Sequence, residues 1–156
     1  MLWKQAGPRL NFFEAKGMSE PSSTQESRPM HHVLVIDDEE SVSRVLQLGL
    51  TRFGYEAKTA ARGGEGLRLF GDEAFDLVIT DILMPDMDGY EVARHIRGSD
   101  RPQTPIIAIS GTPWLLNDDV FDHVLPKPFS LKILAEVVKN LVDQTLTPQT
   151  NTCCGP

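Results

Sequence analysis

Several features that define large classes of protein are scarce in this chain of 156 residues. Its two cysteines, Cys153 and Cys154, are adjacent near the C-terminus, so they cannot cross-link a core, and no cysteine or histidine spacing is typical of a zinc site. The apolar run at residues 33–36 is far shorter than the ~18 residues typical of a membrane span. These absences predict a cytoplasmic protein with no membrane span.

Positive charge is also in short supply. The chain has 15 lysines and arginines against 22 aspartates and glutamates, a net charge of −7 with neutral histidines, and its basic residues do not cluster. Nonspecific binding to a phosphate backbone needs a basic surface, so we expect no direct nucleic-acid binding. With 40% hydrophobic and 24% charged residues, the composition is that of a globular protein with one domain and tails.

The chain divides by composition into three parts. Residues 1–29 contain prolines, glycines and a polar run at 19–27, which together predict a flexible leader. Residues 144–156 are polar and contain proline, which predicts a flexible C-terminal tail. Residues 30–143 form the predicted folded domain. The residues that follow this domain are too few for a DNA-binding fold, so we expect it to stand alone.

Within residues 30–143 the hydrophobic pattern alternates between two periods. Short apolar runs predict strands, and stretches with apolar residues three and four positions apart predict helices. The expected strands lie near 33–36, 55–59, 77–80, 106–109 and 124–125, and the expected helices cover 39–53, 64–70, 90–97 and 131–142. Ser130 is the predicted N-cap of the last helix. This alternation predicts an α/β fold with a doubly wound, five-stranded parallel sheet.

Polar residues follow the carboxyl ends of four expected strands. Asp37 and Asp38 follow the first strand, and Asp81 follows the third. Ser110 follows the fourth strand, and Lys127 follows the fifth. Because ligands of such sheets bind beyond the carboxyl ends of the strands, we expect these side chains to meet in one site.

The chemistry of this site follows from its side chains. Three carboxylates at one edge repel one another unless a cation is bound or one carboxylate is protonated. Hard oxygen donors without cysteine suit Mg²⁺ or Mn²⁺ completed by water. Lys127 adds a positive charge and Ser110 a hydroxyl, so the site can hold a phosphoryl group. The nucleophile would be a carboxylate, and the product an acyl phosphate.

Three motifs resemble those of the receiver domain of two-component response regulators. Residues 33–39, with the sequence VLVIDDE, resemble the first strand and acidic pair of this family. Residues 81–89, with the sequence DILMPDMDG, resemble its phosphoacceptor motif, and residues 127–129, KPF, its closing motif. The resemblance covers about residues 30–143 and implies a flavodoxin-like (βα)5 fold.

The resemblance also implies roles for individual residues. Asp81 would be phosphorylated, and Asp38 and Asp81 would bind Mg²⁺ directly, with Asp37 acting through water. The backbone carbonyl of Leu83 would be a further metal ligand. Ser110 and Lys127 would bind the phosphoryl oxygens. The family's Lys127–Pro128 peptide bond is expected to be cis, and Asp86, Asp88 and Gly89 are interpreted as turn and helix-cap residues.

The same resemblance implies a function in a phosphorelay. The phosphodonor would be a sensor histidine kinase or a histidine phosphotransfer protein, and the signal would continue through protein–protein contacts. Such a protein is not an enzyme in the metabolic sense, because it catalyses only its own phosphorylation and dephosphorylation.

Two departures from the family keep a second hypothesis open. Ser110 and Lys127 are 17 residues apart, fewer than is usual in the family, which predicts a shortened fourth helix. Val124 stands where the family usually has an aromatic residue coupled to phosphorylation. Both departures are compatible with a phosphorylation-independent adaptor. A hydrolase is disfavoured, because Leu83 stands where such enzymes have a second aspartate.

Overall fold

A computed structural model describes residues 30–115 and 119–146 of the chain. The elements are β1 (His32–Ile36), α1 (Glu40–Arg52), β2 (Glu56–Ala60), α2 (Gly63–Asp72), β3 (Leu77–Asp81), α3 (Gly89–Arg97), β4 (Ile106–Ser110), the 3-10 helix η1 (Pro113–Leu115), β5 (His123–Pro126) and α4 (Leu131–Leu146). The strands form one sheet in the order β2-β1-β3-β4-β5, and every neighbouring pair is parallel. The predicted doubly wound, five-stranded parallel sheet is confirmed.

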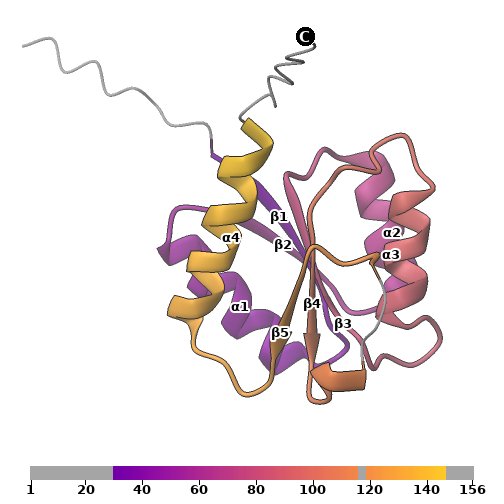
Figure 1. The fold of residues 1–156 in the computed structure, drawn as a ribbon, viewed down its shortest axis with the longest axis horizontal. Coiled ribbons are helices and arrows are strands. Elements are labelled where there is room, and N and C mark those ends of the chain that lie inside the picture. Colours follow the sequence, from indigo (N-terminus) through magenta and orange to yellow (C-terminus); the bar gives the residue numbers. More distant parts are fainter. Residues whose placement is uncertain (1–29, 116–118, 147–156) are drawn as a thin grey trace, which may run out of the picture.

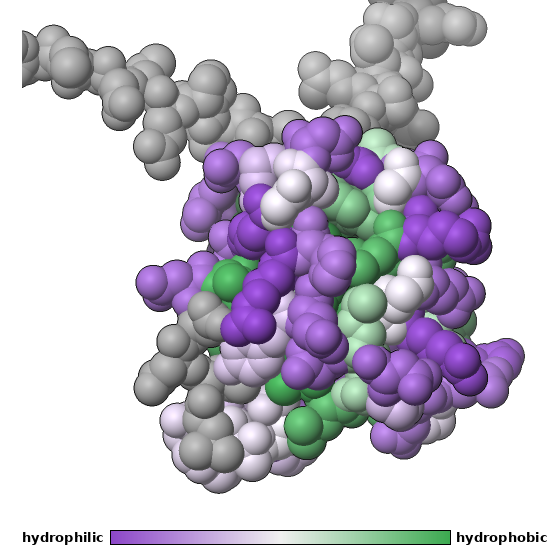
Figure 2. Space-filling view, turned by 90° about the vertical axis from the view of Figure 1, so that its right-hand side faces the viewer, coloured by the Kyte–Doolittle hydropathy of each residue, from purple (hydrophilic) through white to green (hydrophobic). Residues whose placement is uncertain are grey.

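The sheet lies between two layers of helices. Figure 1 shows α1 and α4 on one face and α2 and α3 on the other. Every residue of β3 and β4 is buried, because both faces of these central strands are covered. This explains why their sequences are continuous apolar runs rather than alternating patterns. The outer surface over α2 and α3 is mostly hydrophilic, with narrow apolar patches between the polar side chains (Figure 2).

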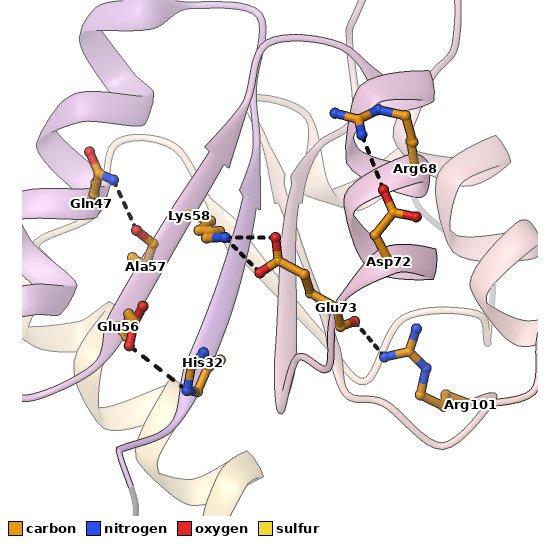
Figure 3. A network of polar contacts seen from close by, with 9 residues as sticks. All are labelled: His32, Gln47, Glu56, Ala57, Lys58, Arg68, Asp72, Glu73 and Arg101. Carbon is orange, nitrogen blue, oxygen red and sulfur yellow. Dashed lines mark hydrogen bonds and ion pairs between the residues drawn. The ribbon is translucent and has the colours of Figure 1, made fainter.

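Polar side chains fasten the edge strand β2 to its neighbours (Figure 3). Lys58 on this strand donates to both carboxylate oxygens of Glu73, at 2.6 and 2.7 Å. On the other side, the Gln47 amide of α1 donates to the Ala57 carbonyl at 2.9 Å. Charged residues on an exposed edge strand also discourage pairing with other chains.

The connection between β4 and β5 confirms the expected shortening of the fourth helix. In its described residues, 111–115 and 119–122, the only helical turn is η1. Arg97 at the end of α3 anchors this connection: its Nε donates to the Val120 carbonyl at 3.1 Å, and its Nη2 lies 2.6 Å from Asp122 Oδ2. The same Asp122 oxygen accepts the Ile106 N–H at 2.7 Å, so α3 and β4 together position the start of β5.

The last helix begins as expected and ends later than expected. Ser130 Oγ accepts the Ile133 N–H at 3.3 Å, which confirms the predicted N-cap. However, α4 continues to Leu146, so residues 144–146 belong to the helix and not to the predicted tail. The sequence has no helix breaker before Pro148, and the residue preceding a proline disfavours helical geometry. The leader at 1–29 and the rest of the tail lie outside the described residues.

None of the helices within the described ranges is long and apolar enough to cross a membrane.

Candidate functional site

A cavity of about 520 Å³ lies beyond the carboxyl ends of the strands. These strand ends are at the lower end of the sheet in Figure 1. Its lining includes all six predicted site residues, Asp37, Asp38, Asp81, Leu83, Ser110 and Lys127. The parallel sheet brings these residues together although they are spread over most of the domain sequence. Glu39 also lines the cavity. Glu39 is not among the predicted site residues, although its position directly after the acidic pair is a signal for this location.

Asp81 and Lys127 form the closest contact in this site. Asp81 ends β3 with an exposure of 7%, and its Oδ1 lies 2.6 Å from Lys127 Nζ. Its other oxygen, Oδ2, accepts the backbone N–H of Leu83 at 3.0 Å. Burial by itself lowers the pKa of Lys127, but the hydrogen bond and charge of Asp81 outweigh this effect and raise that pKa above its ordinary value. Lys127 therefore stays protonated beside the carboxylate.

Asp37 is held in the wall of the cavity with an exposure of 2%. Its Oδ1 accepts the Glu39 N–H at 2.9 Å, whereas Oδ2 is a buried oxygen without a hydrogen-bond partner in the described part of the chain. Burial raises the pKa of Asp37 above 3.8, opposed by the Glu39 N–H and Lys127 and reinforced by the charges of Asp81 and Asp38. A bound cation would therefore stabilise the ionised form of Asp37.

The remaining predicted residues complete the rim. Asp38 is exposed to solvent, and Leu83 is 75% exposed. Ser110 is buried, and its hydroxyl oxygen accepts the Thr112 N–H at 3.0 Å. The Lys127–Pro128 peptide bond that leads away from the site is cis, as expected.

The loop that follows Asp81 closes on Gly89. The Gly89 N–H donates to the Ile82 carbonyl at 3.1 Å, and a Cβ at this position would lie 2.5 Å from the Asp81 carbonyl oxygen. Only glycine fits this approach of α3 to the end of β3. Asp88 caps α3, because its Oδ1 accepts the Glu91 N–H at 2.8 Å and its own N–H donates to the Glu91 carboxylate. The interpretation of this segment as turn and cap is confirmed.

A sequence model of the family described as "Response regulator receiver domain" matches residues 33–139. The chain belongs to this family. Receiver domains are signalling modules of two-component systems, not metabolic enzymes, and they interact with histidine kinases.

This receiver domain is similar to parts of longer proteins. It is 38% identical over 128 residues to the sensor histidine kinase AtsR of Burkholderia thailandensis, covering 78% of this chain and 21% of that protein. It is 33% identical over 129 residues to the probable transcriptional regulator ycf27 of Cyanidium caldarium, covering 79% of this chain and 51% of that protein. The chain thus spans about half the length, or less, of these curated relatives.

Solved structures share the fold of this receiver domain. The response regulator protein TrrA of Thermotoga maritima, solved in complex with Mg²⁺–BeF, is 36% identical with a TM-score of 0.67, covering 72% of this chain and 99% of that one. A receiver domain protein from Clostridium thermocellum is 28% identical with a TM-score of 0.69, covering 74% and 97%. The flavodoxin-like architecture is therefore shared with receiver domains of known structure.

The side chains of this receiver domain fit a hard divalent cation. As they stand, no three His, Cys, Asp or Glu side chains cluster tightly enough in residues 30–115 and 119–146 to form a metal-binding group. The cavity nevertheless offers an all-oxygen donor set, and the buried Oδ2 of Asp37 has no hydrogen-bond partner in those residues. Oxygen donors with room for water are what Mg²⁺ prefers. The donor chemistry therefore fits Mg²⁺.

Proposed function

We propose that this receiver domain accepts a phosphoryl group on Asp81 from a sensor histidine kinase or a histidine phosphotransfer protein, and that it signals by protein–protein contacts. The observation that carries the proposal is the 2.6 Å contact between Asp81 Oδ1 and Lys127 Nζ, inside a cavity lined also by Asp37, Asp38 and Ser110. The cavity therefore brings together a nucleophilic carboxylate, the positively charged Lys127 side chain, further carboxylates and a hydroxyl.

The transfer requires these residues to act in different ways. An oxygen of Asp81 forms a bond to phosphorus while the bond between phosphorus and the donor imidazole nitrogen breaks, and the imidazole leaves with the electron pair and takes a proton from solvent. Lys127 is within reach to exchange its contact with Asp81 for a phosphoryl oxygen, because Lys is a flexible point charge. Ser110 can donate its hydroxyl proton to another phosphoryl oxygen while it still accepts from Thr112.

Asp37, Asp38, Asp81 and the Leu83 carbonyl are the groups that would hold Mg²⁺ or Mn²⁺. A divalent ion bound there supplies positive charge that neutralises the phosphoryl oxygens during transfer. The protein's part is to aim the carboxylates, and the buried position of Asp37 serves that purpose.

The phosphodonor protein has to approach through the open side of the cavity. Beside that opening, a mainly apolar groove of about 450 Å³ runs between α1 and residues 127–131, and Glu39 and Lys127 line both the groove and the cavity. Val45 of α1 lines the groove and is 54% exposed, so it offers an apolar surface to a partner there. We expect the phosphodonor to cover this groove, since it adjoins the reacting carboxylate.

A phosphorylation-independent adaptor is the second candidate, and the β4–β5 connection favours it. The described part of this connection contains only the single turn η1, and Val124 is a half-buried aliphatic residue with no ring to move. In that case the acidic cavity would not accept a phosphoryl group.

Incubation with acetyl phosphate and Mg²⁺, followed by intact mass measurement, separates the two candidates. We expect one added phosphoryl group in the wild type, none in Asp81→Asn and none in EDTA. Asp86→Asn is the matched control, because Asp86 is an exposed aspartate of the same loop that does not line the cavity. A folded wild-type protein that stays unmodified with fresh donor would support the adaptor.

A further inference from the structure

The turn between β1 and α1, residues 37–39, carries two of the predicted metal-binding carboxylates. We infer that Ser43 is a positioning residue for this metal site: its hydroxyl fixes the turn so that Asp37 and Asp38 line the cavity. The inference rests on the proposed function, because it assumes that a divalent cation binds there.

Ser43 contacts both ends of the acidic turn. It lies in α1 with an exposure of 6%, and its Oγ donates to the backbone carbonyl of Asp37 at 3.0 Å. Its backbone N–H donates to the Glu39 carbonyl at 3.0 Å, which is the ordinary helical bond of this position. One residue of α1 therefore holds the carbonyls at the beginning and at the end of the turn.

The other polar atoms of Asp37 are also hydrogen-bonded to the protein, with one exception. Its N–H donates to the Ala60 carbonyl of β2 at 3.1 Å, and its Oδ1 accepts the Glu39 N–H at 2.9 Å. Within the described ranges, Oδ2 is the one buried side-chain oxygen or nitrogen that has no hydrogen-bond partner. Every polar group of Asp37 is thus held by the protein except the carboxylate oxygen Oδ2.

A fixed turn matters because Mg²⁺ tolerates little deviation from its preferred geometry. Groups that hydrogen-bond to metal ligands and so orient them typically contribute a factor of about 10 to 100 to metal affinity. Without the Ser43 hydroxyl, the buried carbonyl of Asp37 loses its side-chain donor, and the first turn of α1 can shift relative to the end of β1. Both carboxylates would then move together, because Asp37 and Asp38 are consecutive.

The test compares Ser43 variants of the full chain by their Mg²⁺ affinity, measured from the Mg²⁺-dependent rise in melting temperature. We expect Ser43→Ala to bind Mg²⁺ about tenfold more weakly, and Ser43→Thr, which keeps a hydroxyl, to restore the affinity. Thr51→Ala is the matched control, since its hydroxyl also donates to a carbonyl of α1, that of Gln47 at 2.8 Å, but on the exposed side of the helix. This control should bind Mg²⁺ like the wild type.

A second readout separates positioning from catalysis. In phosphorylation by acetyl phosphate, Ser43→Ala should raise the half-saturating Mg²⁺ concentration about tenfold, while the rate at saturating Mg²⁺ stays close to that of the wild type. If Ser43→Ala does not fold, Ser43→Cys carries the same test, because it keeps the side-chain volume with a much weaker donor.

The results of these experiments distinguish a failure of the Ser43 inference from a failure of the proposed function. A lower melting temperature with unchanged Mg²⁺ affinity in the Ala and Cys variants would show that Ser43 only stabilises the fold, and would overturn the inference while leaving the proposed function intact. A wild-type protein that binds no Mg²⁺ and accepts no phosphoryl group would overturn both.

Discussion

Replacing Gly89 with alanine tests the close approach of α3 to the phosphoacceptor. A Cβ at this position would lie 2.5 Å from the Asp81 carbonyl oxygen and 3.0 Å from the Ile82 Cα. Carbon and oxygen atoms in proteins rarely approach closer than about 3.3 Å. The base of the loop would therefore have to open by about 0.8 Å. Because both contacted atoms belong to the backbone, neither can rotate away.

The magnitude follows from two opposing effects. Overpacking of this kind costs roughly 1–3 kcal/mol, and the rigid backbone contacts place Gly89→Ala at the upper end. Alanine recovers roughly 0.5–1 kcal/mol over glycine in a helix, so the net loss of unfolding free energy is about 2 kcal/mol. For a domain of this size, this loss lowers the melting temperature by roughly 6–10 °C. The movement of the backbone also displaces Asp81, so phosphorylation by acetyl phosphate should slow.

Thermal unfolding followed by circular dichroism measures the effect, and Gly64→Ala is its control. Gly64 lies in the first turn of α2, and a Cβ there would meet nothing within 4 Å. The control should therefore keep or slightly raise the melting temperature. If Gly89→Ala melts at the same temperature as Gly64→Ala and is phosphorylated like the wild type, the steric reasoning is wrong.

Three further predictions concern other parts of the domain. Arg97→Ala should lower the unfolding free energy, measured by urea denaturation, by roughly 2–3 kcal/mol. Arg68→Ala breaks only the exposed ion pair with Asp72 and should lower it by at most about 1 kcal/mol. Equal losses in the two variants would refute the role of Arg97 in anchoring the β4–β5 connection. Because the pKa of Asp37 is raised above 3.8, the metal-free fold should lose stability as the pH rises through this raised pKa and Asp37 ionises. The Mg²⁺ affinity should fall as the pH drops through the same pKa and Asp37 becomes protonated. If stability and Mg²⁺ affinity depend on pH in Asp37→Asn as they do in the wild type, this prediction is contradicted. Val45→Glu should slow phosphoryl transfer from phosphorylated histidine kinases but not from acetyl phosphate. Leu48→Glu is the control, because Leu48 is an exposed residue of α1 that does not line the groove. Equal rates of transfer from the kinase in both variants would argue against docking in the groove.

Much of the fold was predictable because the signals are local. Continuous apolar runs indicated the buried central strands, and the sheet confirms them at β3 and β4. Ser130 before an apolar helical pattern indicated the start of α4. The end of that helix was predicted too early, because a polar last turn resembles a tail and its helical state depends on the absence of a breaker before Pro148.

The family motifs, the α/β alternation and the set of residues at the carboxyl ends of the strands can all be read from the order of the amino acids. The way in which these residues meet depends on the packing of the folded chain. The contact of Asp81 with Lys127 joins residues 46 positions apart, so its geometry depends on the packing of β3, β4 and β5 and not on any local propensity. The Ser43 bond to Asp37 crosses a turn at a spacing of six, outside the three- and four-residue periods by which helical neighbours are recognised, so no sequence pattern could indicate it.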